Sequence, residues 1–172
     1  MAEEIRVFIS EDEVEEKIKQ LAQQISVDYE GRSIHIICIL KGSAFFACRL
    51  AQHLTIPVTM DFMSVSSYGN GTESSGRVKI TKDLDDSIEE KDVLIIEDII
   101  DSGITLSYLM ELLQVRKPKS LTLCTLLSKE ARRVVDIPVQ YVGFSIPDKF
   151  VVGYGLDYAQ KFRNLPYIGI IN

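Results

Sequence analysis

Apolar residues follow two alternating patterns along this chain. In the first, they recur every three or four residues, as Val14, Ile18 and Leu21 do behind the capping-box pair Ser10 and Glu13, and this spacing is typical of an amphipathic helix. In the second, several apolar residues follow one another, as expected for a strand buried on both faces. These patterns predict strands at 35–40, 58–63, 78–84, 93–97, 121–127, 139–144 and 167–171, and helices at 14–25, 44–54 and 108–115.

The alternation of strands and helices indicates α/β architecture. Such an order favours a mostly parallel central sheet flanked by helices. The 172 residues are enough for one compact domain with a sizeable core. No internal repeat or linker divides them, so we expect a single domain over residues 1–172.

Three acids interrupt the end of the most hydrophobic strand, in the segment VLIIEDIIDSGITL at 93–106. Acids are costly inside an apolar segment, and ligands of open parallel sheets bind beyond the carboxyl ends of the strands. We therefore expect Glu97, Asp98 and Asp101 to line a ligand site. The small, hydroxyl-bearing residues at 102–105 precede a helix and suit a phosphate. The combination fits a ribose 5-phosphate.

A simpler interpretation covers part of this segment. An Asp or Ser before a helix is most often an N-cap. Capping would account for Asp101 or Ser102, but it leaves Glu97 and Asp98 unexplained. The glycine-rich patterns of P-loop and dinucleotide-binding proteins do not occur in the chain.

Composition narrows the class of protein. The formal net charge is −6 and the pI is near 5.0, which argues against broad binding to nucleic acids or membranes. No apolar run is long enough to span a bilayer, and the first residues show no signal-peptide pattern. The three cysteines, Cys38, Cys48 and Cys124, lack metal-type spacing and predict reduced core residues in a cytosolic protein.

The segment 93–106 resembles the phosphoribosyl-diphosphate-binding motif of the type I phosphoribosyltransferases. Residues 40–43, Ser67-Tyr68 and the block at 142–158 make the chain similar to the hypoxanthine-guanine phosphoribosyltransferases over nearly its whole length. The resemblance implies the type I phosphoribosyltransferase fold, with a small hood formed by terminal segments. It implies transfer of the phosphoribosyl group of 5-phosphoribosyl 1-diphosphate to N9 of hypoxanthine and/or guanine, a purine-salvage reaction that gives IMP or GMP and pyrophosphate.

The resemblance also implies roles for residues around the acidic segment. Asp101 corresponds to the catalytic general base or proton acceptor at purine N7. Glu97 and Asp98 would face the ribose hydroxyls or the metal. The 5-phosphate would be bound by Ser102, Gly103, Ile104 and Thr105.

Base recognition is implied for the block near the carboxyl end. By resemblance, Lys149 would donate to purine O6, which would exclude adenine. Phe150 would stack on the purine, and the main chain of Val151 would meet the pyrimidine edge. Lys129 matches a lysine that lies near the base and phosphate in relatives. Taken alone, Lys149 would be a solvated lysine and Phe150 a core aromatic residue.

The pyrophosphate and its metal are assigned to further residues by the same resemblance. Lys41 and Gly42 correspond to a pyrophosphate loop, in which relatives often carry a cis peptide before the lysine. Arg163 would hold the leaving pyrophosphate. The implied cofactor is Mg²⁺, a hard cation that bridges phosphate oxygens and carboxylates. Its expected carboxylate ligands are Glu97, Asp98 and Asp157.

A polar loop at about 64–77 is either a plain surface loop or, by resemblance, a flexible lid in which Ser67 and Tyr68 close over the diphosphate. Relatives form homodimers or homotetramers, and we expect one of these states. Two other classes of protein remain to be compared with the enzyme. A regulator of the same fold would need a basic face, whereas a phosphate-binding signalling module would need neither a lid nor the pair Lys149 and Phe150.

Overall fold

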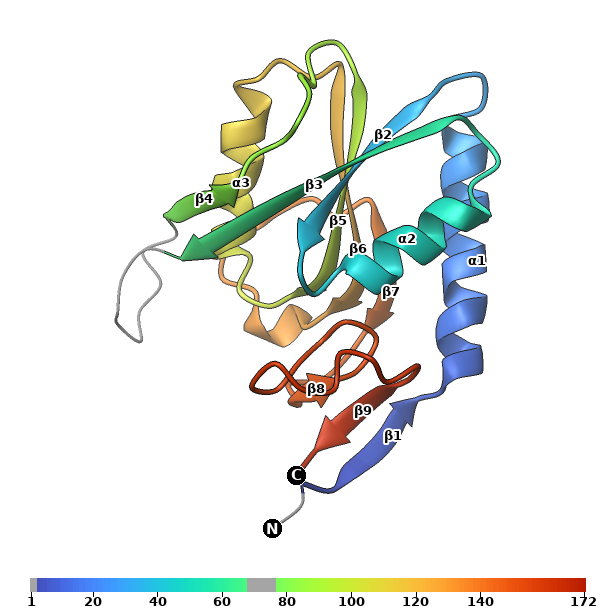
Figure 1. Cartoon of the computed structure of the whole chain (residues 1–172), viewed down its shortest axis with the longest axis vertical. Coiled ribbons are helices and arrows are strands. Elements are labelled where there is room, and N and C mark those ends of the chain that lie inside the picture. The colour runs from blue at the N-terminus through green and yellow to red at the C-terminus, as the bar shows by residue number, and fades with distance from the viewer. Residues whose placement is uncertain (1–2, 68–76) are drawn as a thin grey trace.

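The computed structural model of the protein describes residues 3–67 and 77–172. The molecule contains a large and a small β-sheet, and helices cover the large sheet (Figure 1). The elements are β1 (Ile5–Ile9), α1 (Glu11–Asp28), β2 (Ile34–Leu40), α2 (Ala44–His53), β3 (Val58–Ser67), β4 (Val78–Lys82), β5 (Asp92–Ile100), α3 (Ile104–Gln114), β6 (Ser120–Ser128), a 3₁₀ turn (Glu130–Arg132), β7 (Tyr141–Ser145), β8 (Val151–Val152) and β9 (Ile168–Ile171).

The large sheet has six strands in the order β4-β3-β2-β5-β6-β7. All neighbours in it are parallel except β4, which pairs antiparallel with β3 at one edge. The prediction of a mostly parallel sheet is therefore confirmed. Because β2, β5, β6 and β7 point the same way, the residues that follow them emerge at one edge of the sheet.

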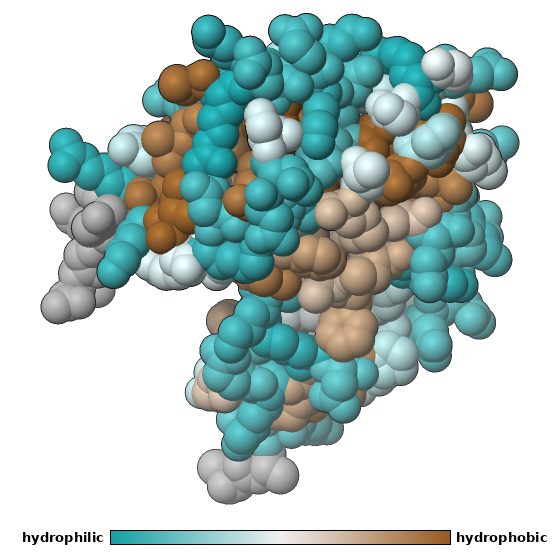
Figure 2. All heavy atoms as spheres, turned by 45° about the horizontal axis from the view of Figure 1, so that its top comes forward, coloured by the Kyte–Doolittle hydropathy of each residue, from teal (hydrophilic) through white to brown (hydrophobic). Residues whose placement is uncertain are grey.

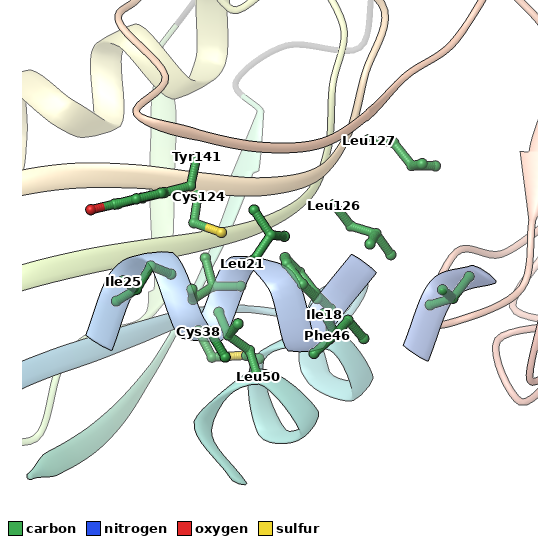
Figure 3. Packing of buried hydrophobic residues seen from close by; sticks show 14 of the residues in the cluster. Ile18, Leu21, Ile25, Cys38, Phe46, Leu50, Cys124, Leu126, Leu127 and Tyr141 are labelled. Atoms are coloured by element: carbon green, nitrogen blue, oxygen red, sulfur yellow. The ribbon is translucent and has the colours of Figure 1, made fainter. Parts of the chain in front are cut away.

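Helices α1 and α2 cover one face of this sheet, and α3 covers the other (Figure 1). Strand β5 is buried on both faces: Leu94 and Ile96 pack toward α1 and α2, while Val93 and Ile95 pack toward α3. Figure 3 shows the first of these cores, in which the apolar stripe of α1 meets side chains of α2 and the sheet. The continuous apolar runs in the sequence reflect this burial on two sides.

The small sheet contains strands from both terminal segments, in the order β1-β9-β8. Its antiparallel register joins Arg6 to Ile170 and Val151 to Ile170. It lies beyond the carboxyl ends of the large sheet (Figure 1). This arrangement confirms the predicted hood, although the sequence pattern alone did not reveal β1 or β8.

Three expectations are corrected in detail. Strand β5 continues to Ile100 and α3 begins at Ile104, so both elements are longer than predicted. Strand β3 runs to Ser67, so residues 64–67 belong to a strand instead of to the polar loop. Cys38 and Cys124 are buried as expected, but Cys48 is exposed because it lies on the outer side of α2.

None of the helices in the described residues combines the length and the apolar composition that crossing a bilayer requires.

Charged side chains join helices α1 and α2. Arg49 of α2 donates from Nε to both carboxylate oxygens of Glu15 on α1, at 3.1 and 3.0 Å. His53 Nε2 lies 2.8 Å from Glu15 Oε1. Hydrogen bonding to Arg49, opposed by burial, lowers the pKa of Glu15 to about 2.

We predict that this contact stabilises the protein in a pH-dependent manner. Because the folded-state pKa of Glu15 is depressed, its contribution is complete above the unfolded pKa and is lost as the pH falls through the folded value. Glu15→Gln should lower the free energy of unfolding by about 1–2 kcal/mol at pH 7, and the deficit should shrink between about pH 4.5 and 2. Urea unfolding across this range measures the effect. Glu16→Gln, at a neighbouring exposed position, is the control; an equal deficit in both variants would contradict the prediction.

Candidate active site

The acids predicted from the sequence lie at the carboxyl end of β5. Glu97 and Asp98 are partly buried there. Burial raises the pKa of both groups, and the adjacent Asp98 carboxylate raises that of Glu97 further. The N–H of Ile99 donates to Asp98 Oδ1 at 2.7 Å, which fixes the direction of that side chain. Two oxygen-rich groups are thus held side by side at the edge where ligands of parallel sheets bind.

The loop after β2 lies directly against these acids. Gly42 is so close to Asp98 that a Cβ on it would be 1.8 Å from Asp98 Oδ2. On its other side, a Cβ on Gly155 would be 2.0 Å from the carbonyl oxygen of Gly42. The Leu40–Lys41 peptide is cis, as the resemblance predicted. Glycines at 42 and 155 therefore allow the body of the molecule and the loop after β8 to approach main chain to main chain.

Polar side chains of that loop form a network beside Lys41. Arg163 Nη2 lies 3.3 Å from Asp157 Oδ1, and Arg163 Nη1 donates to the carbonyl of Gly155 at 2.7 Å. Gln160 Oε1 accepts from both Lys41 Nζ and Arg163 Nη2 at 3.4 Å. The positive charge of Arg163 also lowers the pKa of Asp98, against the larger effect of burial. The structure thus brings Lys41, Asp98, Asp157 and Arg163 together.

The turn between β5 and α3 has the form expected of an anion cradle. Gly103 has φ +82°, a left-handed conformation that glycine adopts readily, and it directly precedes the helix. The Ser102 hydroxyl accepts from the N–H of Ile104 at 3.3 Å, but the N-cap of α3 is Gly103, and no side chain in the described ranges caps the helix, so N-capping does not account for Asp101 or Ser102. A hollow of about 320 Å³ adjoins the turn, lined by Glu97, Ile99, Ile100, Asp101, Ser102, Gly103, Thr105 and Leu106.

A buried lysine links this turn to the segment after β7. Lys129, only 8% exposed, places Nζ 3.7 Å from Asp101 Oδ1 and 3.6 Å from Asp148 Oδ1. Arg132 joins the cluster, with Nη1 3.3 Å from Asp148 Oδ2 and Nε 4.0 Å from Asp101 Oδ1. One ammonium group therefore contacts both carboxylates, which places the tip at 148–150 on the same side of the molecule as Asp101.

The residues proposed for base recognition follow Asp148. Phe150 is 53% exposed, and its ring meets Tyr158 edge-on with centroids 5.8 Å apart. Val151 is buried in β8. Lys149 is exposed, and its ammonium group makes no ion pair within the described ranges. Phe150 thus presents a face to solvent beside the site, which is unusual for a large aromatic residue with only a core role.

Two predicted positions, Ser67 and Tyr68, come from the lid segment of the sequence. Ser67 ends β3, where it pairs with Val78 of β4. Tyr68 lies outside the described residues, as does most of the predicted lid. An open indentation separates the large body of the molecule from the smaller part that carries the hood (Figure 2).

A wider hollow, of about 800 Å³, lies elsewhere. Its lining comes from the end of α1, the end of α2 and the residues that precede β2 and β3. It therefore lies at the amino ends of the strands, and it contains none of the predicted site residues. The chemistry-bearing groups gather at the opposite, carboxyl edge.

Several residues of the site were not recognised in the sequence. Asp148, Arg132 and Gln160 join the clusters described above, and Arg133 hydrogen-bonds the turn that carries Asp101. Asp148 immediately precedes Lys149, so its place in the same block was the one available signal. The remaining three are common surface residue types, and their roles follow only from the packing of the loops.

Comparisons with known proteins agree with this geometry. A family model described as phosphoribosyl transferase domain matches residues 10–159. The hypoxanthine-guanine phosphoribosyltransferase of Bacillus subtilis is 54% identical over 166 residues, which cover 96% of this chain and 92% of the relative. The hypoxanthine phosphoribosyltransferase of Salmonella typhimurium is 52% identical over 171 residues, which cover 98% of this chain and 96% of the relative.

Longer relatives and solved structures extend the comparison. A bifunctional TilS/HprT protein of Listeria monocytogenes is 57% identical over 96% of this chain, which spans only 26% of that relative's length. The crystal structure of a hypoxanthine-guanine phosphoribosyltransferase from Bacillus anthracis superposes with a TM-score of 0.95 at 52% identity, covering 98% of this chain and all of that one. The chain therefore belongs to the phosphoribosyltransferase family, among the hypoxanthine phosphoribosyltransferases.

Proposed function

We propose that the protein transfers the phosphoribosyl group of 5-phosphoribosyl 1-diphosphate to N9 of hypoxanthine and/or guanine. The C1–oxygen bond to pyrophosphate breaks, the C1–N9 bond forms, and the purine loses a proton, giving IMP or GMP. The observation that carries this proposal is the position of Lys129 between Asp101 and Asp148. It supports the proposal because it joins the acidic turn to Asp148, two residues before the exposed Phe150, and a single nucleotide requires the two to be neighbours.

The sugar phosphate fits the groups after β5. Ser102, Gly103, Ile104 and Thr105 surround the start of α3, where N–H groups and the helix dipole favour an anion. Glu97 and Asp98 are the acceptors for the two ribose hydroxyls. Because burial raises the pKa of both acids, hydroxyl donors or a cation would stabilise their charged forms.

The pyrophosphate end fits the network around the loop after β2. Lys41 and Arg163 are the cations here, and the main chain at Gly42 allows close approach. They gather with two carboxylates, those of Asp98 and Asp157, so the four groups offer no net positive charge to a diphosphate. No cluster of three or more metal-ligating side chains occurs in residues 3–67 and 77–172. A cation shared between one or two carboxylates and diphosphate oxygens fits this donor set.

We propose Mg²⁺ as that cation, held by one or two of the carboxylates expected from the sequence, those of Glu97, Asp98 and Asp157. When bound, Mg²⁺ would neutralise charge on the leaving pyrophosphate. The residues of the chain do the rest: Arg163 and Lys41 orient the leaving group, while Asp101 supplies negative charge near the purine.

Asp101 is suited to accept the purine proton. Its side chain is 48% exposed at the mouth of the hollow, and Lys129 and Arg132 hold its Oδ1 within 4.0 Å. A carboxylate in this position also stabilises the positive charge that develops on the ribosyl group as pyrophosphate leaves. The ring of Phe150 stacks on the purine, and the main chain of Val151 contacts the pyrimidine edge of the base.

By resemblance, Lys149 donates to purine O6, and its exposed ammonium group makes no ion pair within the described ranges, so its donors are free for a ligand. Lys129 is buried, and its ammonium group is already paired with the carboxylates of Asp101 and Asp148. A purine that offers no acceptor would therefore not leave Lys129 unpaired. We keep O6 recognition, and with it the discrimination against adenine, at Lys149, with Lys129 as the second candidate.

Assembly as a homodimer or homotetramer, a cytosolic location, a single-domain organisation and a lid that includes Ser67 and Tyr68 stay predictions from the sequence. The acidic charge of −6 still disfavours nucleic-acid and membrane partners. The relevant partners are the two small-molecule substrates.

The proposed reaction predicts turnover with hypoxanthine and guanine, and little with adenine. The assay supplies 5-phosphoribosyl 1-diphosphate and Mg²⁺ with each purine in turn, xanthine included, and follows nucleotide formation. Chelation with EDTA should abolish the activity, and added Mg²⁺ should restore it. Absence of turnover with every purine would refute the proposal.

Asp101→Asn should lower kcat by about 10²–10⁴-fold, because the amide cannot accept the proton. The dissociation constant for 5-phosphoribosyl 1-diphosphate, measured by calorimetry, should change much less, since the phosphate donors are untouched. Asp12→Asn, at an exposed position on α1, is the matched control. Equal losses in kcat and in binding would remove the role assigned to Asp101.

The two lysines can be separated by the same substitution. Lys149→Met should raise KM for hypoxanthine by about 10²-fold and narrow the preference over adenine, because the donor to O6 is lost. Lys129→Met should change the preference for hypoxanthine over adenine by less than about threefold. The reverse result would move O6 recognition to Lys129.

A further inference from the structure

The segment after β6 makes hydrogen bonds to the main chain of the turn that carries Asp101. Arg133 Nε donates to the main-chain carbonyl of Asp101 at 3.2 Å, and Arg133 Nη2 donates to Ser128 Oγ at 2.7 Å. The N–H groups of Val134 and Val135 donate to the carbonyl of Ser102 at 2.9 and 3.2 Å. Two successive carbonyls of the turn therefore point toward residues 133–135.

These contacts also determine where the N–H groups of the turn point. In a planar trans peptide, the C=O and the N–H point in opposite directions. The carbonyl of Asp101 shares its peptide plane with the N–H of Ser102, and the carbonyl of Ser102 shares its plane with the N–H of Gly103. Both N–H groups consequently face away from Arg133.

The N–H groups of Ser102 and Gly103 have no hydrogen-bond acceptor in the part of the chain that the structure describes. The same is true of the N–H groups of Thr105 and Leu106 in the first turn of α3. All four residues line the hollow of about 320 Å³. The first N–H groups of any helix lack an intrahelical acceptor, and here they gather with those of the preceding turn around one hollow, which suits an anion.

We propose that Arg133 is a positioning residue for the phosphate of the substrate. Its guanidinium group bridges the carbonyl of Asp101 and the buried hydroxyl of Ser128, and so holds the Asp101–Ser102 peptide with its N–H toward the hollow. This inference builds on the proposed function, which assigns the hollow to the 5-phosphate of 5-phosphoribosyl 1-diphosphate.

The chemistry of arginine suits this role. Its planar fork supplies two donors at fixed separation, whereas the single ammonium group of lysine cannot reproduce that geometry. The side chain is also packed: a Cβ on Gly103 would be 3.2 Å from Arg133 Cδ. The carboxylate of Asp101 is held separately by Lys129, so loss of Arg133 should disturb phosphate binding more than proton transfer.

Steady-state kinetics test this division. Arg133→Met should raise KM for 5-phosphoribosyl 1-diphosphate by about tenfold or more, because small displacements of binding groups are costly, while KM for hypoxanthine changes less than about threefold. Arg133→Lys should recover only part of the loss. Arg116→Met, which breaks a surface ion pair with Asp83, should match the wild type. An unchanged KM for the diphosphate in Arg133→Met, or a fall in kcat alone, would overturn the proposal.

Ser128→Ala provides a milder variant if Arg133→Met does not fold. It removes one hydroxyl and leaves the guanidinium with a single anchor. KM for 5-phosphoribosyl 1-diphosphate should rise about two- to fivefold, and thermal unfolding should stay close to that of the wild type. A wild-type KM in a folded Ser128→Ala protein would contradict the bridge.

A binding measurement separates this inference from the proposed function. Inorganic phosphate is titrated while the ¹⁵N–¹H signals of Ser102 and Gly103 are followed by NMR. These signals should shift in the wild type, and Arg133→Met should weaken the apparent affinity about tenfold, which Arg116→Met should not do. Phosphate binding of this kind without phosphoribosyl transfer would refute the function and retain the role of Arg133. Transfer activity with equal phosphate affinity in Arg133→Met would refute the role and retain the function.

Discussion

The parallel pairing of β5 with β6 is the constraint on which the rest of the site depends. Its register places Ile100 opposite Ser128, and the N–H of Lys129 donates to the carbonyl of Ile100 at 2.9 Å. The turn after one strand is therefore adjacent to the segment after the other. A slip of one residue in this pairing would exchange the two faces of β5. The burial of Leu94 and Ile95 on opposite faces therefore also determines where the site residues at the end of β5 lie.

Charged groups gather in two places around this frame. On the purine side, Lys129 and Arg132 balance Asp101 and Asp148, so the four groups are nearly neutral together. On the pyrophosphate side, Asp98 and Asp157 offset Lys41 and Arg163, and burial raises the pKa of Asp98 and of the adjacent Glu97. A neutral set of groups suits an uncharged base, but it offers no net attraction to a diphosphate, so the pyrophosphate side requires an added cation.

Local patterns in the sequence predicted most of the elements and the acidic end of β5. Runs such as 93–97 are determined by burial on two faces, which is visible in the sequence itself. The start of α3 was placed too late because Ile104, Thr105 and Ser107, three of the first four residues of the helix, are weak helix formers. The hood strand β8 has only two residues, too few for any periodic pattern.

Those parts of the site that lie in one continuous stretch of sequence could be predicted, whereas residues whose partners are distant in sequence could not. The acid-hydroxyl-glycine turn is contiguous, and the resemblance of the block at 142–158 supplied Lys149 and Phe150. Arg133 and Gln160 escaped notice because their partners are distant in sequence or belong to the main chain. Cys48 was misplaced because an apolar neighbourhood in the sequence does not say which side of a helix faces the core.

The hood shows how order of synthesis bears on the site. Strand β1 is made before the other described strands, yet its partner β9 is the last of them to be made. A three-stranded sheet of such short strands is marginal by itself. The strands of the large sheet, with the acids at the end of β5, precede Asp157 and Arg163 along the chain. During synthesis the phosphate half of the site is therefore made before the diphosphate half is complete.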